Sequence, residues 1–133
     1  MTTDSGSPEP MEKGQDLWTL PTIISLEIVH VRYKKPIEYF IKSKLVQIGE
    51  ATEFLVKTSQ DFPIRALSPA LFVGDVPVTE GTRLDKNLYR FVVPGPDSER
   101  LKAGTPISIG WAGVKAKKMT TNFQFQIQRE ENR

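Results

Sequence analysis

The sequence predicts an all-β protein, an antiparallel β-sandwich of about seven to nine strands. Apolar side chains recur at every second position through most of the chain, which is the geometry of strands rather than of helices. Ten prolines and nine glycines separate the apolar runs. Proline is excluded from central strands because it has no backbone N–H to donate. Short alternating runs with turn signals at this spacing are typical of a sandwich or a barrel.

The clearest strand is the stretch NFQFQIQ near the C-terminus, where apolar and amide side chains alternate. The first apolar run, IISLEIVHV, is apolar in both phases, which indicates burial on two sides or a switch between sheets. Similar runs bring the total to about eight strands: IEYFIKSKLVQI, TEFLVKT, IRALSPALFV, VPV, LYRFVV and PISIGW. The alternation predicts inward positions for six aromatic rings: Phe40, Phe54, Phe72, Phe91, Phe123 and Phe125.

Gly74 stands between two β-prone runs, LFV and VPV. A phosphate-binding loop needs several glycines at a strand-to-helix junction and usually a Lys-Ser/Thr pair. Here a single glycine is followed by Asp75, so a hairpin turn is favoured. Further breaks are expected at Lys35–Pro36 and at Gly49, and one helical turn is expected at Asp97–Leu101.

The composition is that of one folded domain, with 133 residues, 38% hydrophobic and 26% charged. Residues 1–16 are rich in Ser, Pro, Gly and Glu. With four carboxylates and one lysine, they predict a disordered acidic tail of net charge −3. Residues 17–129 are expected to form a single β-sandwich domain. From 17 to 128, fifteen basic and ten acidic residues give +5, which is below the charge of a dedicated nucleic-acid binder.

The chain has no cysteine, which excludes a disulfide framework, a thiolate zinc site and a cysteine nucleophile. Its N-terminus carries no apolar h-region of a secretory signal. The longest apolar stretch, residues 17–31, is too short and too polar to span a bilayer. These features predict no membrane span and, by default, a cytoplasmic protein.

Five blocks of the sequence resemble, in order and approximate spacing, the IPT/TIG immunoglobulin-like domains. The resemblance lies mainly within residues 49–111; residues 30–48 would be a long insertion or an extra strand pair, and the segment after 111 has no obvious counterpart. It implies an immunoglobulin-like sandwich that is not catalytic and that contacts protein, carbohydrate or DNA, or serves as a spacer. The family has no universal binding residues. The blocks are PTIISL (21–26), GEATEFLVKTSQDFP (49–63), LFVGDVPV (71–78), NLYRFVVPGP (87–96) and AGTPISI (103–109).

The residues offer no constellation for catalysis or metal binding. His30 is the one histidine, and a triad would also need a nucleophile elbow such as G-x-S-x-G, which is missing. The favoured interpretation of His30 is an imidazole whose hydrogen bonds go to backbone. Asp61, Asp75 and Asp85 lie in turn-like contexts where a bond to backbone explains them. We therefore expect no enzyme, no metal site and no cofactor.

Basic side chains supply the candidate contact surface. Three segments, VRYKKP, KSK and VKAKK, the last expected to be a loop, could contact a polyanion or a partner beside an aromatic ring. The alternative is that lysines protect exposed strand edges. The leading hypothesis is a non-catalytic module that binds a protein or a carbohydrate. Nucleic-acid binding and a small-ligand pocket inside a closed barrel are the alternatives. The candidate residues are Arg32, Lys34, Lys35, Lys42, Lys44, Lys115, Lys117, Lys118 and Trp111.

Overall fold

The computed structural model describes residues 19–41, 43–63 and 68–133, with the backbone alone at residues 41 and 114–117. The expected acidic tail, residues 1–16, therefore lies outside the described residues. Nine strands and one helical turn are found in the described part: β2 (Ile23–Ile41), β3 (Lys44–Thr58), β4 (Pro69–Val73), β5 (Val76–Val78), β6 (Gly81–Asp85), β7 (Leu88–Pro94), α2 (Gly95–Ser98), β8 (Pro106–Trp111), β9 (Val114–Gln124) and β10 (Arg129–Asn132).

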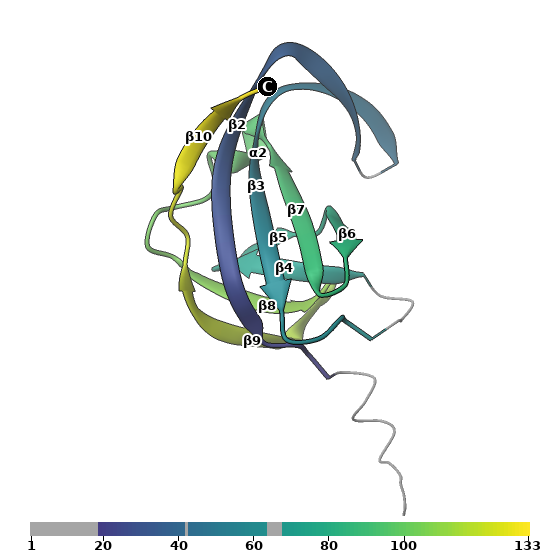
Figure 1. The fold of residues 1–133 in the computed structure, drawn as a ribbon, viewed down its shortest axis with the longest axis vertical. Helices are drawn as coiled ribbons and strands as arrows, with labels where there is room; N and C mark the ends of the chain where they lie inside the picture. The colour runs from purple at the N-terminus through teal and green to yellow at the C-terminus, as the bar shows by residue number, and fades with distance from the viewer. Residues whose placement is uncertain (1–18, 42, 64–67) are drawn as a thin grey trace, which may run out of the picture.

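The strands form two sheets that stack as a β-sandwich, which confirms the predicted fold class (Figure 1). The first sheet has the order β10-β2-β3-β7-β6 and the second the order β5-β4-β8-β9. Successive hairpins alternate between the two sheets along the chain. The sheets do not close into a barrel, so the barrel interior suggested for a small ligand is not formed.

The core lies between the sheets, where the alternation predicted it. Phe54 and Phe91 of the first sheet and Phe72 and Trp111 of the second are each at most 1% exposed. Phe62, from the connection after β3, packs edge-on against Trp111 with ring centroids 5.5 Å apart. Each such side chain gains about 1.5–3 kcal/mol from leaving water, so the aromatic rings fix how the sheets stack.

The Gly74-Asp75 pair forms the tight turn between β4 and β5, as the sequence predicted. Gly74 has φ +61°, and Asp75 is not among the residues with positive φ. A turn that needs positive φ at its first central residue alone is of the type II′ pattern, in which glycine is preferred there. The expected helical turn also forms, two residues earlier than predicted, as α2. No helix among the described residues is long and apolar enough to cross a membrane.

The C-terminal region differs from the prediction in three ways. The segment VKAKK is not a loop, because its backbone begins β9. The NFQFQIQ stretch leaves the strand at Gln124, so Phe125 is buried while Ile127 is 45% exposed. The last residues then add β10, which runs parallel to β2 although every other described pair is antiparallel. Its sequence, REEN, has no apolar period that would have indicated a strand.

Asp61 fastens the connection after β3 to the β6–β7 hairpin. Its carboxylate accepts two hydrogen bonds from the Arg83 guanidinium, one from the Asn87 backbone N–H at 2.7 Å, and one from the Tyr89 hydroxyl. These bonds, above all those from Arg83, lower the pKa of Asp61 to about 2. Asp61 thus bonds to the backbone of a distant hairpin and to a charged partner, rather than to the backbone of its own turn.

We expect Asp61 to make the protein less stable in acid. A carboxylate whose pKa is depressed on folding contributes stability that is present above its unfolded pKa, near 4, and is lost as pH falls toward 2. The denaturant midpoint of the wild type should therefore fall between pH 5 and pH 2.5. In Asp61→Asn, which keeps an acceptor for Asn87 and cannot ionise, the fall should be smaller. Asp75→Asn, in the β4–β5 turn, is the control and should follow the wild type; equal slopes in all three would contradict the assignment.

Candidate functional site: the arch of the β2–β3 hairpin

The β2–β3 hairpin extends beyond the sandwich and curls over, forming the feature that we call the arch, residues 32–50 (Figure 1). The register explains the bend. Arg32 pairs with Glu50 and Ile37 with Ile48, so four residues of β2 lie opposite Gly49 alone. An enlarged bulge of this kind bends and twists a hairpin. The breakers Pro36 and Gly49 were predicted to end strands; that prediction is wrong, since they bend one continuous hairpin.

The arch tip exposes apolar side chains to solvent. Phe40 is 63% exposed and Leu45 59%, and the two residues are direct cross-strand partners. Val46 is 36% exposed and pairs with Tyr39, so its side chain lies on the other face of the hairpin. The predicted inward position of Phe40 is therefore wrong, because the chain turns at Ser43 (φ 64°) instead of continuing as one strand. Each face of the tip therefore carries an exposed apolar side chain.

Under the arch, a second small cluster of apolar side chains lies on the outer face of the first sheet. We call it the cradle. The arch bends toward the sheet here, because its own residues pack on side chains of the β3 and β7 strands. The cluster has its own packing, separate from the core between the sheets. Its members are Tyr33 and Ile37 and Tyr39 from β2, Ile48 and Ala51 from β3, and Val92 from β7.

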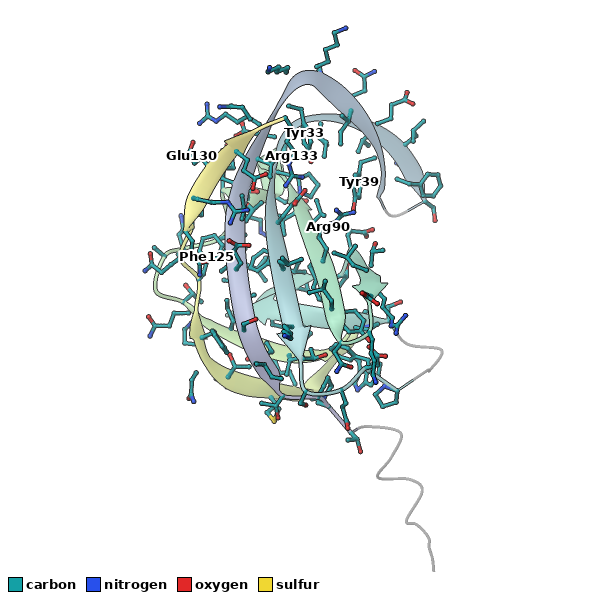
Figure 2. The ribbon with its side chains drawn as sticks, in the orientation of Figure 1. Tyr33, Tyr39, Arg90, Phe125, Glu130 and Arg133 are labelled. Carbon is teal, nitrogen blue, oxygen red and sulfur yellow. The ribbon has the colours of Figure 1, made fainter. Side chains whose placement is uncertain are left out.

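Arg90 also points from β7 toward the cradle (Figure 2). It is half-buried, two positions from Val92 and therefore on the same strand face. Burial raises the pKa of Tyr39, and the Arg90 guanidinium partly offsets that rise. Burial and the charge of Glu53 likewise raise the pKa of Tyr33, where Arg133 and, more weakly, Arg90 act in the opposite direction. The guanidinium thus lies within electrostatic range of both phenol rings.

A hollow of about 480 Å³ continues beside the cradle. It shares Ile48 with the cradle and reaches the turn that follows β7. Most of its lining is apolar, with Lys44 and Asp97 as the charged residues. The full lining is Lys44, Val46, Gln47, Ile48, Pro94, Pro96 and Asp97. The arch therefore offers a concave surface with an apolar floor and a few charges at its rim.

The predicted basic residues divide between the two ends of the molecule. Arg32, Lys34, Lys35 and Lys44 belong to the arch. Lys118 lies on β9, at the opposite end of the molecule (Figure 1). There its Nζ donates to the Gly74 carbonyl oxygen at 3.3 Å and lies 5.2 Å above the Phe72 ring. Lys42 and the side chains of Lys115 and Lys117 are outside the described residues. The three segments do not form one patch: one lies at the bend of the arch, one at its tip, and the β9 segment is elsewhere.

Trp111, proposed as an aromatic contact, is fully buried. Its ring packs against Phe62 in the core, so it is not accessible to a partner. The sequence placed it correctly in phase with Ile107 and Ile109, which are also buried. That phase is the signal of a core position, and it outweighs the neighbouring lysines.

His30 lies in a different hollow, of about 190 Å³, and is satisfied by a side chain rather than by backbone. Its Nε2 lies 2.7 Å from Glu50 Oε1. The nearby hydroxyls bond elsewhere: Thr52 donates to Ser98 Oγ, and Ser98 Oγ bonds to the Val93 and Pro94 carbonyls. These bonds fasten α2 to β3, which is a structural role. Among the described residues, no three His, Cys, Asp or Glu side chains gather where they could hold a metal.

Sequence reasoning missed Tyr39, Arg90 and the apolar tip as parts of a surface. The available signal was the presence of Pro36 and Gly49 inside a long β-prone stretch; the structure places these two breakers on opposite sides of one bulge. No family model, no curated protein and no solved structure matches the chain.

Proposed function

We propose that the chain is a non-catalytic interaction module that binds a protein partner through its arch. The observation that carries the proposal is the tip. There the side chains of Phe40, Leu45 and Val46 are exposed to solvent on a hairpin that projects from the sandwich. Exposed apolar side chains rimmed by charges typically mark protein contact sites. The resemblance to IPT/TIG immunoglobulin-like domains supports the same class of function.

A protein partner suits the arch better than a polyanion. The basic residues of the arch share it with Glu38 and Glu50, and its tip exposes apolar side chains. Aromatic and aliphatic anchors surrounded by a charged rim are the usual anatomy of a protein interface. A carbohydrate would favour aromatic platforms with many hydrogen-bonding groups, whereas Leu45 and Val46 offer no such groups.

The double substitution Phe40→Ser/Leu45→Ser should abolish partner capture while leaving the fold intact. Both side chains are exposed, so the free energy of unfolding should change by no more than about 0.5 kcal/mol per site. The measurement is affinity capture from an extract of the source cells, read by quantitative mass spectrometry. Ile24→Ser is the matched control, because Ile24 is 57% exposed near the start of β2, far from the tip.

The proposal requires that the wild type and the Ile24→Ser variant retain the same protein and that the tip variant loses it. Equal capture by the tip variant would overturn it. Retention of the wild type on heparin, with an affinity that falls steeply as salt rises, would favour polyanion binding instead.

A further inference from the structure

Arg90 is a half-buried cation without an anionic partner among the described residues. Other arginines of the same sheet are paired: Arg83 with Asp61, Arg129 with Glu27 and Glu131, and Arg133 with Glu53 and Glu131. No ion pair or hydrogen bond joins the Arg90 guanidinium to any of these groups. A guanidinium that is partly removed from water gains most from a carboxylate that meets its two parallel N–H groups.

The two tyrosines add hydrogen-bonding capacity at the same place. Tyr33 and Tyr39 are half-buried in the cradle, and no hydrogen bond of either hydroxyl is found among the described residues. A phenol hydroxyl can donate to an anion. Tyr33 and Tyr39 in the cradle, and Arg90 beside it, thus offer unmatched donors next to the apolar side chains of Ile37, Ile48 and Val92.

We infer that the cradle binds the carboxylate of a Glu or Asp side chain within an extended segment of the protein partner, with Arg90 as the ion-pairing group and Tyr33 and Tyr39 as hydrogen-bond donors. This inference rests on the proposed function. The apolar hollow beside the cradle receives the residues that flank the acidic side chain.

The surrounding charges favour one carboxylate over a polyanion. Glu53 is neutralised by Arg133 at 2.9 Å. Glu80 acts on Tyr39, and Glu53 acts on both tyrosines. Asp97 lines the adjoining hollow. A chain of phosphates or sulfates would meet Glu80 and Asp97, whereas a single carboxylate between apolar neighbours would avoid both.

The test uses two capped pentapeptides, acetyl-Leu-Pro-Glu-Pro-Leu-amide and the same peptide with Gln in place of Glu. The prolines hold the peptides extended, which reduces the entropy lost on binding. Each is titrated into the full chain at low salt and followed by backbone amide NMR shifts. We expect the Glu peptide to shift the amides of Tyr33, Tyr39 and Arg90, and to bind at least about tenfold more tightly than the Gln peptide.

Arg90→Gln should remove this preference, and Tyr33→Phe/Tyr39→Phe should reduce it while keeping both rings. Lys86→Gln, an exposed cation in the turn between β6 and β7, is the matched control and should keep the preference. If Arg90→Gln does not fold, the wild type must still lose its preference between 20 and 500 mM salt. Equal binding of the two peptides, no binding of either, or tighter binding of an oligothymidylate at the same amides would overturn the inference.

Failure of this inference is distinguishable from failure of the proposed function. The tip variant Phe40→Ser/Leu45→Ser should bind the Glu peptide as the wild type does, because the exposed tip is not part of the cradle. If Arg90→Gln captures the cellular partner as well as the wild type does, the carboxylate assignment is wrong and the function of the arch stands. If the tip variant still captures that partner, the proposed function is wrong.

Discussion

Replacing Trp111 by Ala should lower the free energy of unfolding by about 3–5 kcal/mol, the range found when a large aromatic side chain is deleted from a close-packed core. The indole is fully buried and contacts Phe62, which in turn packs edge-on against Tyr89 with centroids 5.1 Å apart. Loss of the indole would remove the contact of the second sheet with the Phe62 and Tyr89 rings and leave a cavity beside them. Chemical denaturation followed by far-UV circular dichroism measures the effect.

Trp111→Phe should cost much less, about 1 kcal/mol. Phenylalanine keeps most of the apolar surface, and the indole Nε1–H has no hydrogen-bond partner among the described residues. A buried donor without a partner carries a desolvation cost, so its removal offsets part of the lost volume. Ile24→Ala is the control and should change stability by less than about 0.5 kcal/mol, since Ile24 is 57% exposed. Equal small effects for Trp111→Ala and Ile24→Ala would show that the ring is not a core residue.

The contrast between Trp111 and Phe40 shows which parts of this fold the sequence predicts. Trp111 continues the phase of Ile107 and Ile109, and all three are buried. Phe40 also falls in an alternating run, yet it is 63% exposed. Alternation predicts that the two faces of a strand differ in polarity. It does not predict whether a second sheet packs against the apolar face. Where the strands project beyond the sandwich, that second sheet is missing.

The arch could not be derived from local signals, because its shape depends on pairing between distant residues. Proline and glycine usually interrupt a strand, and the bend becomes evident only when Pro36 and Gly49 are placed on opposite sides of one bulge. The register shift there decides which side chains face the sheet. Alternation within LYRFVV puts Arg90 on the face opposite the buried Tyr89 and Phe91. It does not show that the neighbouring cradle is built largely from β2 and β3, about forty to sixty positions earlier in the chain.

The C-terminal strand β10 escaped prediction for a related reason. It contributes no apolar side chain and is held by backbone pairing to β2 and by charges: Arg129 with Glu27, Arg133 with Glu53, and Arg32 with Glu130. A short run of charged residues, taken by itself, predicts a solvent-exposed segment rather than a strand. Their partners on β2 and β3 are about eighty to one hundred residues distant, and sequence pattern alone does not connect them.

Arg133→Ala should destabilise the protein by about 1–3 kcal/mol, although Arg133 is 41% exposed. The reason is its partner. The Glu53 side chain is only 11% exposed, and its carboxylate accepts a hydrogen bond from Nη1 of Arg133 at 2.9 Å. Breaking a fully buried pair typically costs about 3–5 kcal/mol because one charge is left in a poorly solvated place. Because Arg133 is partly exposed, water can solvate part of the Glu53 carboxylate once the guanidinium is removed. The expected loss of stability is therefore smaller than for a fully buried pair.

The matched control is Arg32→Ala, which removes an ion pair between β2 and β10. The Arg32–Glu130 ion pair spans 3.9 Å between side chains that are 61% and 66% exposed, and such pairs are worth about 0–1 kcal/mol. The second arm adds Glu53→Gln to Arg133→Ala. Because the buried charge is then gone, the double variant should recover part of the stability that Arg133→Ala loses, so the two changes should not be additive. Denaturant midpoints that fall equally for Arg133→Ala and Arg32→Ala, with full additivity in the double variant, would mean that water already compensates Glu53 and that β10 is held by its backbone pairing to β2.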